Sequence, residues 1–279
     1  ASVTGAAGCF APCATISNVT PPATGGGTSS TEFNWQTTCD HVASTSECAT
    51  LSTTHNFIFK YQDDFCPTRG FNIVNVAVTV LGEPVVESPD PHCASTAANG
   101  DITLTWETVT DNAVPPSFVE YAIFHSTSPN GPFQEIGAVP NIATNTYTHT
   151  AANPTAPPIT TGANYYHIRT RSGCNDAELE APVDDIASIF LTVTDNTTTA
   201  DLTWNALATP PLSSSNTQYD VWRLEPMGAW TQIGSTSNLF YTDPVIWCAN
   251  ELITYRVELS DNLGCISVSN EVSENLDNP

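Results

Sequence analysis

Two adjacent carboxylates, Asp63 and Asp64, precede Cys66 in the segment YQDDFCPTRGF, which covers residues 61–71. Such residues serve three kinds of chemistry: glycosidase carboxylate pairs, calcium coordination and disulfide formation. Neighbouring residues of a strand point to opposite sides, so two adjacent aspartates do not face each other as a glycosidase pair must. We therefore interpret both as turn residues before Pro67, whose side chains bond their own backbone. Calcium binding by Asp63 and Asp64 is the alternative, although no EF-hand-like loop surrounds them.

Nine cysteines supply the other reactive groups, and their pattern favours disulfides over a metal centre. No pair has zinc-ribbon spacing, and the six histidines are scattered along the chain. Cysteines near strand ends indicate disulfides, which form in an oxidising compartment. The odd number leaves one free thiol or one bond to another chain. The nine are Cys9, Cys13, Cys39, Cys48, Cys66, Cys93, Cys174, Cys248 and Cys265.

The sequence lacks the short motifs of the common enzyme classes. It has no G-x-S-x-G, H-E-x-x-H, P-loop or G-x-G-x-x-G segment. The tight loop CFAPC at residues 9–13 lacks the C-x-x-C spacing of a redox motif. We therefore predict a chain that is not an enzyme and that uses neither a metal nor a cofactor.

The net charge argues against two classes of partner. The 279 residues include 29 acidic residues and six Lys or Arg residues, which gives a formal net charge of −23 at pH 7. A surface this acidic repels nucleic-acid phosphates and anionic lipid. No apolar run approaches the roughly 18 residues of a membrane span. We predict neither nucleic-acid binding nor membrane insertion, and we interpret the acidity as a source of solubility.

Apolar and polar residues alternate through most of the chain, as they do in half-buried β-strands. The runs HNFIFKYQ at 55–62, FNIVNVAVTVLG at 71–82 and DITLTWE at 101–107 each place apolar side chains on one face. Turn signals such as Asn99-Gly100 separate the runs. Short strands separated by such turns predict an all-β protein made of three tandem antiparallel β-sandwiches.

An internal repeat defines the expected domains. DITLTW, ending at Trp106, matches ADLTW, ending at Trp204. The pairs YAIFHS and YDVWRL, GPFQEIG and GAWTQIG, YTH and YTD, and YHIRTRSGC and YRVELSDNLGC follow in the same order. Self-similarity of this extent indicates homologous domains. We place them at 84–186 and 187–279, with a different unit at 1–83.

The two repeats resemble the fibronectin type III domain. They share the Trp that ends the second strand, the Tyr-x-Val pattern of the third strand and the Tyr-x-Val/Ile start of the sixth. Tyr166 and Tyr255 stand where that family carries its tyrosine-corner residue, so the resemblance implies hydroxyls that bond back to the chain. It covers both repeats from end to end and implies two β-sandwiches.

The N-terminal unit, with EFNWQTTCDHV at 32–42, resembles the PKD- or Ig-like domains of secreted cell-surface proteins of Bacteroidota. These include gliding-motility-associated and type IX-secreted adhesin-like proteins, whose modified fibronectin repeats the segment at 247–273 also resembles. In that family a Trp-containing strand ends in Cys, and a second Cys follows an acidic turn. The resemblance implies a disulfide between Cys39 and Cys66 and an extracellular location at the cell surface.

Two further disulfides are expected from positions within the repeats. Cys174 is the repeat equivalent of Cys265, but no equivalent of Cys248 occurs near it. We therefore pair Cys174 with Cys93, which lies on the first strand of the same domain. Cys248 and Cys265 bracket the sixth strand of the last domain and are expected to pair. Each bridge is worth roughly 2–4 kcal/mol, mainly by restricting the unfolded chain.

The first thirty residues, ASVTGAAGCFAPCATISNVTPPATGGGTSS, are small, polar and rich in Gly and Pro. Within them, Cys9 and Cys13 bond each other, or Cys48 takes one of the two; the thiol left over bonds locally or locks neighbouring subunits together. The segment packs on its own domain, or it adds as a strand to an exposed sheet edge of the next subunit. Head-to-tail addition that does not close gives an open filament.

These observations predict a structural function, as a subunit or repeat segment of an extracellular filament or adhesin. Its partners are further copies of the chain, or other domains of the same surface protein. The alternative is a ligand- or carbohydrate-binding accessory module of a secreted hydrolase. Exposed aromatic rings around Trp222 and Trp230 would favour that alternative, whereas Trp35, Trp106 and Trp204 alternate with core positions.

Overall fold

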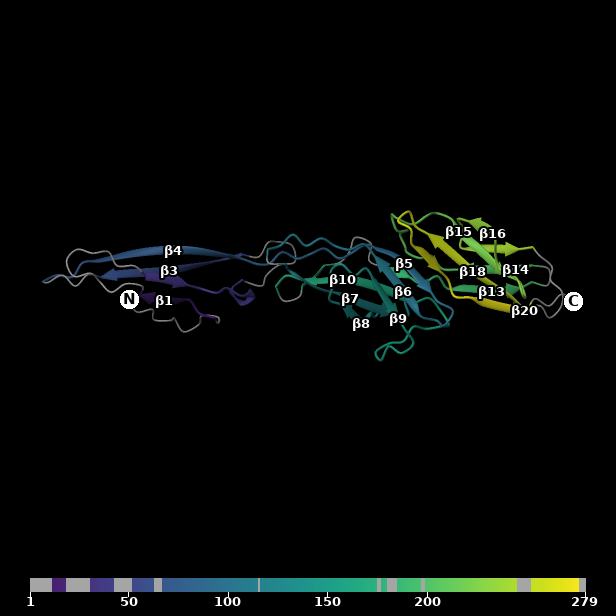
Figure 1. The fold of residues 1–279 in the computed structure, drawn as a ribbon, viewed down its shortest axis with the longest axis horizontal. Helices are drawn as coiled ribbons and strands as arrows, with labels where there is room; N and C mark the ends of the chain where they lie inside the picture. Colours follow the sequence, from purple (N-terminus) through teal and green to yellow (C-terminus); the bar gives the residue numbers. More distant parts are fainter. Residues whose placement is uncertain are drawn as a thin grey trace. The chain divides into compact units, whose positions relative to one another are not determined.

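The computed structural model describes residues 12–18, 31–42, 52–62, 67–114, 116–174, 177–179, 185–196, 199–244 and 252–275. In these ranges it contains twenty β-strands and one short 3-10 helix, which confirms the all-β class. The chain divides into two compact units, residues 1–84 with 173–175 and residues 85–172 with 176–279 (Figure 1). The division at residue 84 lies beside the expected boundary, and the finer division into three domains stays a prediction.

The first unit consists, within the described residues, of two antiparallel strand pairs. β1 (Thr15–Asn18) pairs with β2 (Thr31–Asn34), and β3 (Ser52–Gln62) pairs with β4 (Phe71–Leu81). The 3-10 helix η1 (Cys39–His41) follows β2. Thr and Phe recur in β3 and Val recurs in β4, because β-branched and aromatic side chains suit an extended backbone.

Aromatic contacts hold the two strand pairs together. The ring of Phe33 on β2 lies 4.7 Å from that of Phe57 and 5.5 Å from that of Phe59, centroid to centroid. Trp35 packs 5.1 Å from Phe57. Phe57 and Phe59 alternate along β3, so both point to the face that β2 covers. Trp35 is half-buried, less enclosed than its predicted place in a core.

The second unit holds both repeats, and each is built from a three-stranded and a larger antiparallel sheet. The first repeat has β5 (Pro91–Thr96), β6 (Ile102–Trp106), β7 (Phe118–Ser126), β8 (Gln134–Val139), β9 (Thr146–His149), β10 (Tyr165–Ser172), β11 (Ala177–Leu179) and β12 (Ile186–Ala187). The second has β13 (Leu191–Asp195), β14 (Ala200–Trp204), β15 (Tyr219–Leu224), β16 (Trp230–Thr236), β17 (Phe240–Asp243), β18 (Leu252–Ser260), β19 (Ile266–Val268) and β20 (Val272–Asn275).

The strand order is the same in the two repeats. The sheets β5-β6-β9 and β11-β10-β7-β8 recur as β13-β14-β17 and β19-β18-β15-β16. A short strand also pairs with the central strand of each larger sheet, β12 with β10 and β20 with β18. This order is that of a fibronectin III-type sandwich. The order in which the strands pair is therefore enough to assign the fold of the two repeats.

The core of each repeat forms around the predicted tryptophan. Trp106 and Trp204 are 1% and 6% exposed. Trp106 packs edge-on against Tyr121 at 5.4 Å, and Trp204 packs against Tyr219 at 5.6 Å. Edge-to-face contacts of this kind add about 0.5–1.5 kcal/mol beyond the burial of apolar area. The buried apolar side chains of both repeats form one continuous cluster, so the repeats share a core.

A glycine-tyrosine contact recurs at the same place in both repeats. The pairing of β8 with β7 and of β16 with β15 shifts register at a bulge beside Gly137 and Gly234. A Cβ on Gly137 would lie 2.5 Å from the hydroxyl of Tyr147, and one on Gly234 would lie 2.6 Å from that of Tyr241. The two hydroxyls donate to the carbonyls of the bulged residue just before each glycine. The repeated Ile-Gly and Tyr-Thr motifs are therefore two halves of one packing contact.

Candidate functional sites

The structure corrects the predicted disulfides. Cys39 bonds Cys174 and Cys93 bonds Cys265, across sequence separations of 135 and 172 residues. The predictions that joined Cys39 to Cys66, Cys93 to Cys174 and Cys248 to Cys265 are therefore wrong. They assumed partners within one domain, whereas both bonds connect distant parts of the chain.

The remaining predicted site residues are only partly covered by the structure. Cys13 is disulfide-bonded as well. Six others lie outside the described residues, so the turn and calcium interpretations of the aspartates stay predictions. These six are Cys9, Cys48, Asp63, Asp64, Cys66 and Cys248.

One group of potential metal ligands occurs among the residues that the structure describes. It comprises Cys39, Glu83 and Cys174, whose ligand atoms lie within 4.8 Å of one another. The two cysteines are bonded to each other, however, and a metal binds the thiolate form of cysteine. This group is therefore the surroundings of a disulfide.

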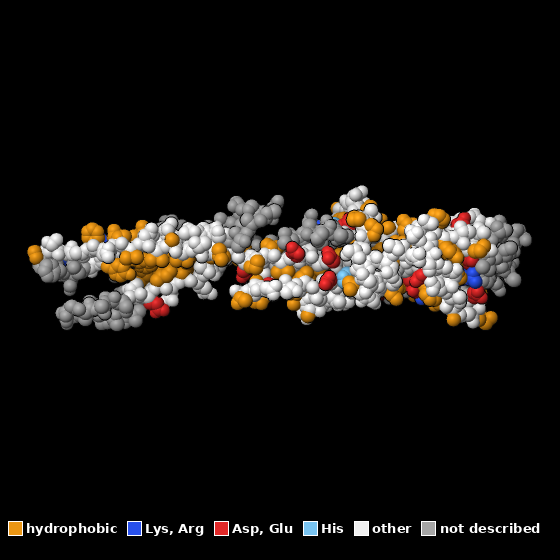
Figure 2. Space-filling view, turned by 90° about the horizontal axis from the view of Figure 1, so that it is seen from above, with side chains coloured by type: hydrophobic (Ala, Val, Ile, Leu, Met, Phe, Trp, Pro, Cys, Tyr) orange, Lys and Arg blue, Asp and Glu red, His pale blue; other side chains and the backbone are white. Residues whose placement is uncertain are grey.

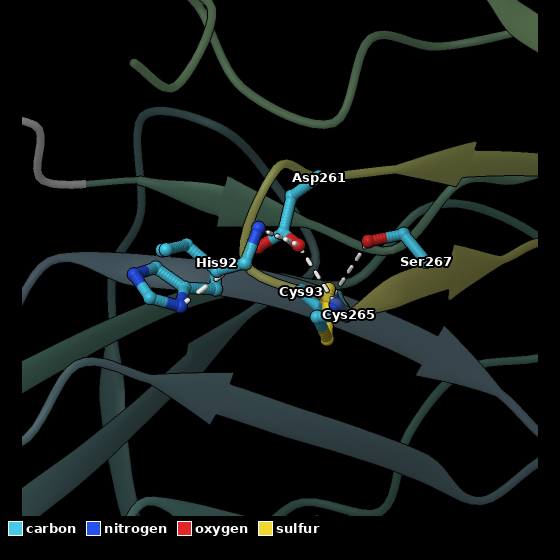
Figure 3. The surroundings of a disulfide bond; sticks show 7 residues. His92, Cys93, Asp261, Cys265 and Ser267 are labelled. Carbon is cyan, nitrogen blue, oxygen red and sulfur yellow. Dashed lines mark hydrogen bonds and ion pairs between the residues drawn. A yellow bond between two sulfur atoms is a disulfide. The ribbon is translucent and has the colours of Figure 1, made fainter. Parts of the chain in front are cut away.

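The Cys93–Cys265 bond closes the junction between the two repeats (Figure 3). Cys93 is 1% exposed on β5, and Cys265 stands in the turn between β18 and β19. The backbone N–H of Ala94 donates to Oγ of Ser267 at 3.2 Å, so the strands also meet through a buried hydrogen bond. These contacts join the first strand of one sandwich to the last hairpin of the other.

Asp261 shapes the turn that carries Cys265. Its Oδ1 accepts the backbone N–H groups of Leu263 at 2.9 Å and of Cys265 at 2.7 Å. Its Oδ2 lies 3.9 Å from Nδ1 of His92 on β5, and its side chain is 2% exposed. Figure 3 shows His92, Asp261 and Ser267 grouped around the disulfide. An Asp that bonds the backbone two and four residues ahead fixes the turn and so positions the sulfur.

The link between the repeats is hydrogen-bonded on both sides. The backbone N–H of Ser188 donates to the carbonyl of Asn164 at 2.8 Å, and its Oγ accepts from the N–H of Asn164 at 3.0 Å. The N–H of Ala187 donates to the carbonyl of Leu207 in the second repeat at 2.7 Å. A linker fixed to both domains removes the freedom that tandem domains normally have.

The first repeat contains a buried cluster of neutral polar groups. Nε2 of His149 lies 2.6 Å from the carbonyl of Ala156, and its Nδ1 lies 2.9 Å from the hydroxyl of Tyr166. Because a carbonyl only accepts, Nε2 carries the proton and Nδ1 accepts from the tyrosine. His125 bonds Oδ1 of Asn164 at 2.9 Å and stacks edge-on against His149 at 4.7 Å. Burial lowers the pKa of both histidines, which keeps them neutral.

The second repeat carries an ion pair at the equivalent positions. Nη1 of Arg223 donates to Oδ2 of Asp243 at 2.9 Å, and the hydroxyl of Tyr255 donates to the same oxygen at 3.0 Å. Burial would lower the pKa of Arg223, but the bonds and charges of Asp243 and Glu225 raise it. These hydroxyl bonds of Tyr166 and Tyr255 go to side chains, and the bond back to the chain that the tyrosine-corner resemblance implies stays a prediction. Both clusters are buried and hydrogen-bonded, which identifies them as structural.

The tryptophans proposed as a sugar platform are covered by an arginine. The guanidinium of Arg256 lies 4.3 Å from the ring centroid of Trp230 and 5.8 Å from that of Trp222. Glu258 holds it with an ion pair of 2.7 Å. Trp222 is half-buried, although its alternation predicted exposure. A ring face that carries a cation does not offer the free stacking surface that a sugar needs.

The β3–β4 hairpin presents an apolar surface to solvent. Opposite-face alternation places four apolar side chains on the side of the hairpin away from Phe57 and Phe59. Figure 2 shows hydrophobic side chains gathered over this hairpin. We call these four side chains the outer face; they are Ile58, 72% exposed, Phe71, 66%, Ile73, 55%, and Leu81, 66%.

The hairpin is also almost free of charge. Its two strands carry a single charged side chain, Lys60, in a chain whose net charge is −23. The alternation in β3 and β4 was visible in the sequence, but the large apolar side chains on the second face were not recognised. The signal was Ile58, Ile73 and Phe71, which fall out of phase with the Phe and Val residues of the inner face. An exposed apolar surface that lacks acids is the kind of surface that proteins use for association.

No protein-family model matches the chain, and no curated protein matches it. Within the described residues, no helix is long and apolar enough to cross a membrane.

Two solved structures are similar over most of the chain. The crystal structure of the chicken CNTN1 FN1-FN3 domains shares 12% identity over 75% of this chain and 76% of that one, with a TM-score of 0.28. The central fibronectin-III array of RIM-binding protein shares 10% identity over 70% of each chain, with a TM-score of 0.28. The strand order, rather than these likenesses, defines the class of the second unit: a tandem of two fibronectin III-type sandwiches closed by a disulfide.

Proposed function

We propose that this chain is a structural module of an extracellular, cell-surface filament or adhesin, and that it associates with further copies of itself through its N-terminal unit. The tandem sandwiches and the long-range disulfides support a rigid extracellular role. The resemblance of the N-terminal unit to PKD- or Ig-like domains of Bacteroidota surface proteins agrees with this role.

The apolar outer face of the β3–β4 hairpin is the observation that carries the proposal. Burial of its side chains against a partner would remove apolar area from water at roughly 25 cal/mol per Å². Among the described residues, the strand that pairs with β3 is β4 alone. An apolar strand with an unpaired edge is a template for pairing with another chain.

The distribution of charge favours a second copy as the partner. Residues 85–279 hold 23 acidic and four basic residues, whereas residues 1–84 hold six acidic and two basic ones. Two copies therefore repel each other least where their N-terminal units meet. Residues 1–14, which precede β1, contain no charged residue, so this segment brings no charged side chain of its own to the outer face. Strand addition by this segment of a second copy gives head-to-tail growth.

Electron microscopy and light scattering of the purified chain under non-reducing conditions test the proposal. We expect filaments, or a mass that rises with concentration, from the intact chain. The double variant Ile58→Glu with Ile73→Glu places two acids on the outer face at exposed positions, so the fold is retained while association is lost. The matched control is Val114→Glu, at a site that is 97% exposed in the second unit, and it associates like the parent.

The same measurement with a chain lacking residues 1–8 tests the strand-addition step and leaves every cysteine in place. Loss of association in this truncated chain supports strand donation by the N-terminal segment. A monodisperse parent at all concentrations, or a hairpin variant that associates normally, would contradict the proposal.

A further inference from the structure

The Cys93–Cys265 bond closes a covalent loop that holds most strands of both sandwiches. The bond spans 172 positions of the sequence. All strands from β6 to β18 lie inside the loop, together with the hydrogen-bonded linker between the repeats. Only β5 and β19 meet at the bond itself, and the two strands lie in contact with each other. The chain thus enters and leaves the loop at the same place, whereas β19 and β20 of the second sandwich follow the bond and lie outside the loop.

We infer that the chain is a tension-bearing tether in which force applied at its two ends passes through the Cys93–Cys265 bond and bypasses residues 94–264, which form all strands from β6 to β18. A sandwich pulled from its termini unfolds when its strands separate, and each residue released adds about 3.5 Å of length. A covalent bond between the points of entry and exit prevents that separation. Residues 94–264 therefore carry no end-to-end load, however far the outer segments are extended.

The noncovalent contacts at the bond stiffen this connection. Oγ of Ser267 accepts the buried N–H of Ala94. Ala94 directly follows Cys93, and Ser267 lies two residues after Cys265. Asp261 holds the backbone N–H of Cys265 at 2.7 Å and also approaches His92 on β5. The two sulfurs are thus held by strands that are already bonded to each other. Load reaching β5 is passed through the bond to β19 without extension of residues 94–264.

The second disulfide leaves this path unchanged. The Cys39–Cys174 bond opens another route from Cys39, but the direct route along the chain from Cys39 to Cys93 is shorter than the route through Cys174. Under tension the shortest covalent route becomes taut first. Removal of the Cys39–Cys174 bond alone therefore leaves the fully extended length unchanged, and the two bonds serve as matched controls for each other.

Single-molecule pulling of the full chain between terminal handles, under non-reducing conditions, tests the inference. One variant, Cys39→Ser with Cys174→Ser, keeps the bond that encloses the repeats. The second variant adds Cys93→Ser and Cys265→Ser. We expect the second variant to reach a fully extended length greater by about 600 Å, from 172 positions at about 3.5 Å each, with additional unfolding steps for the sandwiches.

The parent chain and the first variant are expected to give the same final length. Equal lengths in the two variants would overturn the inference, because the sandwiches would then extend whether or not the bond is present. The fully extended length depends on covalent connectivity and not on whether a variant folds. The measurement therefore remains valid for a variant with a folding defect. The inference is also independent of self-association, which this experiment on single molecules does not involve.

Discussion

The two repeats share a scaffold but fill its centre with different chemistry. In the first, His125, His149 and Tyr166 form a neutral hydrogen-bonded group. In the second, Arg223, Asp243 and Tyr255 occupy the equivalent positions as an ion pair with a tyrosine. The strand order and the glycine-tyrosine contact are the same in both. One sandwich geometry therefore accepts either a neutral or a charged polar centre.

The largest expected effect comes from breaking the charged centre. Asp243→Ala removes the acceptor of both Arg223 and Tyr255 in a site where Asp243 is 2% exposed. We expect a loss of about 3–5 kcal/mol in the free energy of unfolding, because a buried charge loses its partner. Denaturant unfolding of the full chain measures it.

Two controls accompany this variant. Glu271→Ala, at an exposed acid of the same repeat, should change stability by less than about 0.5 kcal/mol. His149→Ala, the neutral counterpart, should cost less than Asp243→Ala, about 1–3 kcal/mol. Equal losses for Asp243→Ala and His149→Ala would contradict the distinction between the centres.

The neutral centre predicts a loss of stability in acid. The pKa values of His125 and His149 are lowered by burial in the folded state, so the unfolded chain binds more protons once the pH falls below about 6.5. Stability therefore falls as the pH falls through that value, by up to about 1.4 kcal/mol per pH unit for each histidine. The second repeat has no histidine in its centre and adds no such loss.

Unfolding measured between pH 7.5 and pH 5 tests this dependence. The double variant His125→Gln with His149→Gln should show a flatter pH profile than the parent, because the other four histidines remain in both. An unchanged slope would mean that these two side chains do not control the response.

The shared packing contact predicts equal costs in the two repeats. Gly137→Ala and Gly234→Ala each place a Cβ within 2.6 Å of a tyrosine ring or hydroxyl. We expect each to destabilise by about 1–3 kcal/mol through overpacking. In a Tyr147→Ala background the Gly137→Ala change should become nearly neutral, since the clashing ring is gone. A cost that persists there would assign the glycine to backbone conformation instead.

The smallest expected effect concerns the arginine that covers the two tryptophans. Arg256→Gln removes the cation from the ring of Trp230, 4.3 Å away, and from its ion pair with Glu258. We expect a loss of about 0.5–1 kcal/mol and a change in tryptophan fluorescence. Arg256→Lys should retain part of both. Binding of soluble oligosaccharides by the Arg256→Gln variant but not by the parent would show that the cation blocks a sugar surface.

Much of the fold could be predicted because its signals are local. Alternation identified the strands, and the ordered recurrence of short motifs identified two repeats before any contact was known. The Ile-Gly and Tyr-Thr motifs were seen, but their contact was not, because it joins two strands that are separated in sequence. The exchange of His125 for Arg223 and of His149 for Asp243 was visible in the repeat alignment. The exchange could be interpreted as a neutral centre replaced by an ion pair only once the structure showed that both positions are buried.

The cysteine pairings could not be predicted from the same signals. The expected pairings joined cysteines of one domain, such as Cys93 and Cys174. The actual partner of Cys93 depends on which hairpin of the second repeat packs against β5, a contact between domains. No local sequence pattern indicates which hairpin packs against β5. The hairpin was likewise predicted as two strands. Its outer face is exposed because β2 packs on the opposite face, which carries Phe57 and Phe59.

Disulfide mapping of the non-reduced protein by mass spectrometry tests the central claim most directly. The account predicts a peptide containing Cys93 linked to one containing Cys265, and a second link between Cys39 and Cys174. Both links disappear on reduction. A link from Cys93 to Cys174, or from Cys248 to Cys265, would contradict it, because each sandwich would then be closed by itself and the tandem would not be one covalent unit.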